Sequence, residues 1–168
     1  MAKIEKSTKK GKTNAMRLLD TAGVAYTVKE YTFDPDDFDG RHVAEQVGME
    51  PGQVFKTLVT RGPKGAVCVC CIPVDKHLDL KALAACAGEK SLELVKVDEL
   101  LGLTGYVRGG CSPLGMKKEY PTFLDESAMV FEEIAVSAGV RGKQVLLPPQ
   151  ALQTLTRAKT GAFTRDMV

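Results

Sequence analysis

Residues 104–115 form a loop in which bare backbone can come close to a ligand. Four glycines, together with Ser112 and Pro113, fall within these twelve residues. Glycine permits φ > 0 and removes the Cβ that would hold a ligand away, while proline lacks an N–H and keeps the residue before it extended. Such a loop can present backbone N–H groups to a carbonyl, carboxyl or phosphate oxygen. A tight turn between two strands is the alternative interpretation, and the loop alone does not separate the two.

A lysine within an apolar strand is the second feature with chemical potential. Residues 53–59 are predicted to form a strand because Val54, Thr57 and Val59 are β-branched. Lys56 lies at its centre, where a charge is costly unless it faces water, a ligand or a cleft. A compact ammonium on a flexible stem can anchor a phosphate or an ester. It can act as a base only where burial or a neighbouring charge lowers its pKa.

Two motifs, Val-Phe-Lys-Thr-Leu at 54–58 and Gly-Gly-Cys-Ser-Pro-Leu-Gly at 109–115, resemble those of the YbaK family. Members of this family are free-standing relatives of the editing insertion domain of bacterial prolyl-tRNA synthetase. The resemblance extends from about residue 14 to about residue 158. It implies a trans-editing deacylase that hydrolyses mischarged tRNA(Pro), most typically Cys-tRNA(Pro). Editing of this kind exists because a pocket for proline cannot reject a similarly small amino acid by binding alone.

The resemblance also implies roles for individual residues. Lys56 is the predicted catalytic residue, and backbone N–H groups of the glycine-rich loop are expected to meet the ester carbonyl oxygen. In cysteine-specific relatives the resemblance implies that the substrate thiol attacks its own ester, so the enzyme needs positioning more than a nucleophile. No cofactor or metal is implied. The predicted substrate-binding residues are Tyr31, Phe38, Thr57, Gly109, Gly110, Cys111, Ser112, Pro113 and Ser137.

One segment departs from the family pattern. Where relatives read Ser-Gly-Gly-Lys-Arg-Gly and carry an aspartate seven residues after the serine, this chain reads Ser-Ala-Gly-Val-Arg-Gly at 137–142 and has Gln144. A neutral amide cannot pair with the α-ammonium of the substrate as a carboxylate can. The preferred aminoacyl group therefore stays open between cysteine and another small residue such as alanine. A non-catalytic partner of a synthetase that binds the tRNA end is the other alternative.

The cysteines and the acidic loop do not predict a metal site. Cys68 and Cys70 would share one face of a strand while Cys71 points to the other, so the three cannot readily meet one ion. The aspartates of 34–39 lack the glycine and closing glutamate of an EF-hand loop. No histidine or other base stands near Cys111 in the sequence, and Cys111 is not predicted to be a nucleophile. Five cysteines without an export signal indicate free thiols and a cytoplasmic protein.

Charge is divided unevenly along the 168 residues. Residues 1–17 hold six basic residues and one acid, whereas the remainder holds seventeen basic residues and twenty acids. Residues 1–13 are predicted to be a basic flexible N-terminal tail, which either contacts phosphates or only aids solubility, and 14–168 to be the editing domain. Expected partners are the 3′ end of aminoacylated tRNA and, as a candidate, prolyl-tRNA synthetase. Neither a membrane nor DNA is expected as a partner.

Strand and helix patterns alternate without an internal repeat and predict one α+β domain. Its expected architecture is a mixed, strongly curved, barrel-like β-sheet with flanking helices. Asn14, Asp79 and the residue pair Pro148-Pro149 mark expected helix starts, and Gly48 and Gly88 mark expected ends. Helices are predicted at 14–22, 41–47, 80–87, 98–103 and from 149, and strands at 25–31, 53–59, 66–73, 92–95, 122–124, 134–137 and 144–147.

Overall fold

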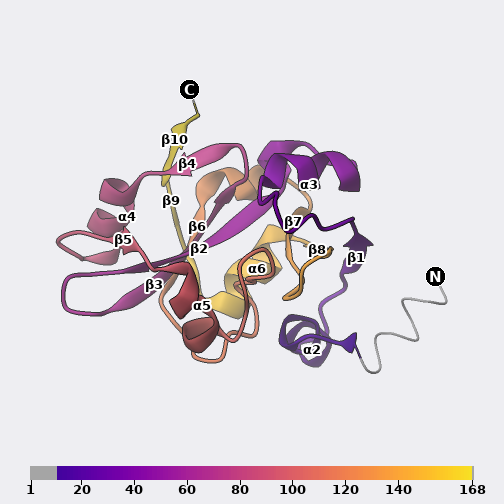
Figure 1. Ribbon diagram of the computed structural model, residues 1–168, viewed down its shortest axis with the longest axis horizontal. Helices are drawn as coiled ribbons and strands as arrows, with labels where there is room; N and C mark the ends of the chain where they lie inside the picture. The colour runs from indigo at the N-terminus through magenta and orange to yellow at the C-terminus, as the bar shows by residue number, and fades with distance from the viewer. Residues whose placement is uncertain (1–10, 168) are drawn as a thin grey trace.

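The computed structural model describes residues 11–167 and has the predicted α+β organisation (Figure 1). The helices are α2 (Asn14–Thr21), α3 (Gly40–Val47), α4 (Leu80–Ala87), α5 (Val97–Thr104) and α6 (Pro149–Thr156), with short 3-10 turns at Pro51–Gln53 and Glu126–Val130. The strands are β1 (Thr27–Glu30), β2 (Phe55–Arg61), β3 (Val67–Pro73), β4 (Lys76–Leu78), β5 (Glu93–Leu94), β6 (Thr122–Asp125), β7 (Ile134–Ser137), β8 (Lys143–Leu147), β9 (Lys159–Gly161) and β10 (Thr164–Asp166).

The strands form three sheets rather than one curled sheet. A mixed five-stranded sheet has the order β5-β2-β3-β6-β9, an antiparallel sheet has the order β1-β8-β7, and β10 pairs with β4. Within the described residues, the first two sheets are joined only by an isolated bridge between Val54 and Ala135, directly before β2. None of the sheets formed by residues 11–167 closes on itself, so the expected barrel-like sheet is wrong. One bridge is too short a ladder to continue the curvature from one sheet into the next.

Strand β3 is central because it is apolar on both faces. Cys68, Cys70 and Ile72 pack on one side, and Cys71 packs on the other. The two sides belong to different core clusters, one containing Leu83 of α4 and the other Leu152 of α6. The predicted alternation of the cysteines is therefore confirmed. Among the described residues, no group of His, Cys, Asp or Glu side chains has an arrangement that could hold a metal ion.

Local capping chemistry accounts for most helix boundaries. Asp79 Oδ1 accepts a hydrogen bond from the N–H of Ala82 (3.0 Å) at the start of α4, and Gly88 ends this helix with φ 72°. Gly48 ends α3 in the same left-handed conformation, at φ 71°. The cap of α2 differs from the prediction, because Thr13 rather than Asn14 accepts the N–H of Met16, at 3.2 Å. A threonine hydroxyl serves this role as an asparagine would.

The predicted basic tail lies largely outside the described residues, and its boundary at residue 13 stays a prediction. Within the described part, Lys12 pairs with Asp20, and Thr13 Oγ1 donates to the carbonyl of Ala138 (2.5 Å). No helix in residues 11–167 has the length and apolar character that crossing a bilayer requires. Helices α2 and α3 lie on the side of the molecule that carries β1, β7 and β8, whereas α4 and the β2–β3 turn lie on the opposite side (Figure 1).

Candidate functional site

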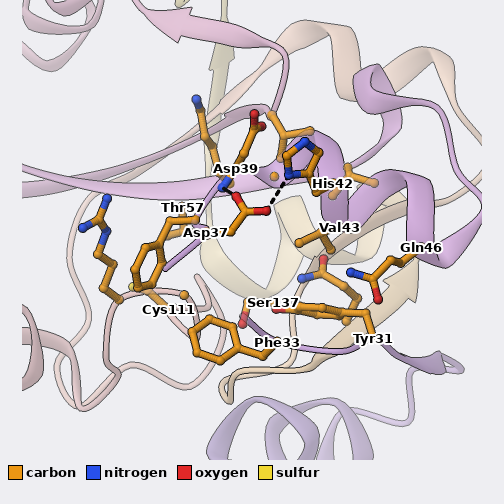
Figure 2. Close-up of a pocket in the computed structure, with 18 of the residues that line it drawn as sticks. Tyr31, Phe33, Asp37, Asp39, His42, Val43, Gln46, Thr57, Cys111 and Ser137 are labelled. Atoms are coloured by element: carbon orange, nitrogen blue, oxygen red, sulfur yellow. Dashed lines mark hydrogen bonds and ion pairs between the residues drawn. The ribbon is translucent and has the colours of Figure 1, made fainter. Parts of the chain in front are cut away.

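A pocket of about 280 Å³ opens where the start of β2 meets the loop before α3, the glycine-rich loop and the β7–β8 pair. Figure 2 shows Tyr31, Phe33 and Ser137 on one side of this pocket and Asp37 and His42 on the other. The predicted site residues that line it are Tyr31, Phe38, Lys56, Thr57, Gly109, Cys111 and Ser137. Gly110, Ser112 and Pro113 do not line it, and Pro113 instead lines a second cavity of about 420 Å³.

Lys56 supplies an ammonium group to this pocket, which Arg108 also lines. Its side chain is half-buried, and burial lowers the pKa of its ammonium, with the carboxylates of Asp39 and Asp75 opposing this effect. Its Nζ takes part in none of the ion pairs formed within residues 11–167. Because a buried charge without a partner is costly, this arrangement is suited to a ligand that supplies oxygen atoms.

Backbone N–H groups of the glycine-rich loop are divided between internal turns and the pocket. Gly110 donates to the carbonyl of Val107 (2.9 Å), and Leu114 donates to Ser112 Oγ (3.2 Å). The N–H groups of Gly109 and Cys111 have no hydrogen-bond acceptor in the described part of the chain. Since both residues line the pocket, these two groups are the candidates for contact with a ligand oxygen.

Gln144 faces Ser137 across the β7–β8 ladder, and both residues line the pocket. The side chain of Gln144 is buried, and its Oε1 has no hydrogen-bond partner among residues 11–167. Ser137 Oγ accepts the N–H of Gly139 (3.2 Å), so that its own hydroxyl proton can point elsewhere. An orphan buried acceptor is costly in an empty protein and favourable once a donor occupies the pocket.

A carboxylate–imidazole pair in the pocket wall was not predicted from the sequence. His42 Nδ1 lies 2.5 Å from Asp37 Oδ2, as the dashed line in Figure 2 marks. The Asp37 carboxylate raises the pKa of His42, and hydrogen bonds from the Asp39 backbone and from His42 lower the pKa of Asp37. The Arg41 guanidinium lowers the pKa of Asp39 to about 2. No motif in the sequence indicated this pair; the structure shows Asp39 as the N-cap of α3, which begins one residue before the predicted start.

The family model described as Aminoacyl-tRNA editing domain matches residues 38–155, which is more than half of the chain. The chain belongs to this family, and the resemblance noted in the sequence is confirmed.

Three relatives illustrate the similarity. EbsC of Enterococcus faecalis, assigned as a Cys-tRNA(Pro)/Cys-tRNA(Cys) deacylase, is 45% identical over 153 residues, covering 91% of this chain and 93% of EbsC. YwhH of Bacillus subtilis is 25% identical over 127 residues, covering 76% of this chain and 80% of YwhH. A crystal structure assigned as a trans-editing enzyme for prolyl-tRNA synthetase has a TM-score of 0.79 and 27% identity, covering 90% of this chain and 95% of that one.

Proposed function

We propose that this chain is a trans-editing deacylase that hydrolyses the ester of mischarged tRNA(Pro), with Cys-tRNA(Pro) as its substrate. The observation that carries the proposal is the half-buried Lys56 ammonium, which has no ion-pair partner in the described residues and lines one pocket with the glycine-rich loop. The names of the relatives support the same reaction class. Residues 14–168 would form the catalytic domain, with the 3′ end of the tRNA as its partner and prolyl-tRNA synthetase as a candidate for delivering it.

In this proposal the pocket holds the ester and neutralises the charge that develops on it. Lys56 anchors an oxygen of the ester or of the terminal phosphate. The N–H groups of Gly109 and Cys111 receive the carbonyl oxygen as it becomes negative. The N–H of Gly110 donates to the carbonyl of Val107, so in this proposal Gly110 holds the turn and does not bind the ester. Tyr31, Phe38, Thr57 and Ser137 would enclose the aminoacyl group.

The chemistry needs no nucleophile from the protein. The cysteinyl thiol loses its proton and attacks its own ester carbon, the new S–C bond replaces the C–O bond to the ribose, and the ribose oxygen takes up a proton in exchange for the one that left the sulfur. Water then opens the resulting thiolactone to give cysteine. For an aminoacyl group without a thiol, water must attack the ester directly, and the pocket then contributes only positioning and charge stabilisation.

Gln144 bears on the choice of aminoacyl group. Its buried Oε1 offers one neutral acceptor to an α-ammonium, where an aspartate would offer a full charge. The aspartates that line the pocket, Asp34, Asp37 and Asp39, also supply negative charge to it. Cysteinyl and alanyl groups carry the same α-ammonium, so glutamine in place of aspartate favours neither, and a deacylase for alanine stays the second candidate for the pocket.

Hydrolysis of tRNA(Pro) charged with cysteine, serine, alanine or proline tests the proposal. Serine is close to cysteine in shape but is a much poorer nucleophile, so we expect Cys-tRNA(Pro) to be deacylated fastest and Pro-tRNA(Pro) to be spared. Faster deacylation of Ala-tRNA(Pro) would assign the second candidate. Tight binding of tRNA with no hydrolysis of any of the four would identify a binding module instead.

Cys111 lines the pocket, but its thiol is not expected to react. Burial raises the pKa of this thiol to about 11, and the side chain packs in a core cluster with Val59, Val69 and Tyr106. Because the thiolate is the nucleophilic form, the C111S variant should keep most of the wild-type deacylation rate. In the native protein, iodoacetamide should modify Cys86 first, since Cys86 is exposed. A loss of activity of about a hundredfold in C111S, with an unchanged melting temperature, would favour a covalent mechanism.

A further inference from the structure

Two aromatic rings and two guanidinium groups form a cluster at the pocket, here called the rim cluster: Phe33, Phe38, Arg108 and Arg141. Arg108 Cζ lies 4.1 Å from the centre of the Phe38 ring. Arg141 Cζ lies 4.8 Å from the centre of Phe33 and 5.7 Å from that of Phe38. The two rings meet edge to face with their centres 5.7 Å apart. Phe33, Phe38 and Arg108 all line the pocket.

The rim cluster is held together by three loops that are distant in the sequence: the loop before α3, the glycine-rich loop and the β7–β8 turn. Arg141 Nε donates to the carbonyl of Arg108 (2.8 Å), which ties the β7–β8 turn to the glycine-rich loop. A Cβ at Gly109 would lie 3.1 Å from Phe38 and 3.2 Å from Phe33, so glycine lets both rings pack against the loop. The aromatic rings and guanidinium groups are therefore positioned before any ligand binds, which lowers the entropic cost of binding.

Both guanidinium groups keep their charge available. Arg108 and Arg141 are exposed, and neither forms an ion pair with any of residues 11–167. The nearest acidic loop uses Asp37 for His42 and Asp39 for Arg41. Asp34 and Asp36 stay exposed on that loop, and neither forms an ion pair with Arg108 or Arg141.

We infer that the rim cluster is a nucleotide subsite that takes the 3′-terminal base of the RNA and the phosphate beside it. The base stacks on the outer face of the Arg108 guanidinium, whose inner face is covered by Phe38, and Arg141 binds the phosphate. Planar guanidinium groups and aromatic rings stack bases of any sequence, and arginine pairs with phosphate through its fork of N–H groups. The inference rests on the proposed function, because it places the terminal nucleotide next to the pocket for its aminoacyl group.

The test measures binding of an uncharged RNA hairpin with a single-stranded CCA end, so that no reaction is needed. Its partner RNA lacks only the terminal base. The variants are R108A, F38L and R141A, with K64A as the control, because Lys64 is exposed in the β2–β3 turn on the side of the molecule opposite α3 (Figure 1). Fluorescence anisotropy at several salt concentrations gives Kd and its salt dependence for each pair, and thermal melting confirms that each variant is folded.

Removing the base should weaken wild-type binding about tenfold, the scale of one stacked base. R108A and F38L should weaken binding of the complete RNA by about the same factor. Removing the base should then weaken the binding of these two variants little further. R141A should reduce the slope of log Kd against log salt by about 0.7, the value for one phosphate contact on a single strand. K64A should behave like the wild type.

The inference would be overturned if removing the base weakened binding by the same factor in the wild type, R108A and F38L. It would also be overturned if the wild type bound both RNAs with the same Kd. The two proposals fail separately. A chain that deacylates Cys-tRNA(Pro) but whose variants bind both RNAs like the wild type keeps its proposed function and loses this subsite. A chain that shows the expected binding cycle but hydrolyses no aminoacyl-tRNA keeps the subsite and loses the proposed activity.

Discussion

The K56A variant should deacylate Cys-tRNA(Pro) about a hundredfold or more slowly than the wild type, the scale of misplacing a reacting group. The ammonium of Lys56 is half-buried in the pocket wall and makes no ion pair with any described residue. Among residues 11–167, Lys56 is the one lysine that lines the pocket, and this variant removes it. Single-turnover deacylation with saturating enzyme separates this loss from weaker tRNA binding.

The same substitution should leave the fold intact or stabilise it. Burial lowers the pKa of Lys56, so the folded chain binds this proton less tightly than the unfolded chain does. The penalty is fully present below the lowered folded-state pKa, and it shrinks as the pH rises from there to the ordinary lysine value. Replacing Lys56 by alanine removes the penalty at neutral pH. Thermal melting of K56A at or above the wild-type temperature is the expected result, with K64A as the matched loss of one surface lysine.

Two further measurements separate anchoring from general charge. K56R keeps the charge on a longer, planar group, so it should restore tRNA binding better than it restores turnover. If the charged ammonium is the active form, wild-type deacylation, corrected for spontaneous ester hydrolysis, should fall as the pH rises through the lowered pKa, and K56A should show no such step. Deacylation by K56A at the wild-type rate would reject the catalytic role of Lys56.

The elements that could be predicted are those with strong local signals. Helix α4 begins after an aspartate cap and ends at a glycine in the left-handed conformation, and β3 is a continuous apolar run. Strands β4, β9 and β10 were missed because each has only three residues, most of them exposed or half-buried, and pairs with a segment far away in the chain. Their polar side chains carry no period-2 pattern, so only the tertiary pairing makes them strands. The division of the strands into separate sheets was not predictable either, because within residues 11–167 the five-stranded and three-stranded sheets meet only at the long-range bridge between Val54 and Ala135.

The candidate site was predictable only where a motif carried it. Lys56, Gly109 and Cys111 stand in two recognisable motifs, and the structure brings all three to one pocket. Phe33 and Arg108 have no local pattern, because their environment arises only when loops separated by more than seventy residues pack together. Which backbone N–H groups of the glycine-rich loop are free to bind a ligand also could not be predicted. The N–H of Gly110 is occupied by a turn whose formation depends on the conformation of the loop.

Gly115 should be the least replaceable glycine of the loop. A Cβ at this position would lie 2.6 Å from the backbone C of Asn14 and 2.9 Å from the backbone N of Ala15, and φ is +69°. Backbone atoms at the start of α2 cannot move aside as a flexible side chain would. The G115A variant should therefore lose about 4 kcal/mol of unfolding free energy, from left-handed strain together with overpacking.

Gly65 offers the matched control for this prediction. It has φ +91° in the β2–β3 turn, but a Cβ there would meet no atom within 4 Å. The G65A variant therefore carries the backbone strain alone and should lose only about 1 to 2 kcal/mol. Urea denaturation of both variants measures the difference, which isolates the cost of the close approach between loop and helix. Equal losses in G65A and G115A would mean that α2 yields to the added methyl group. The glycine-rich loop would then not depend on α2 for its position, and Gly115 would be required only for its backbone conformation.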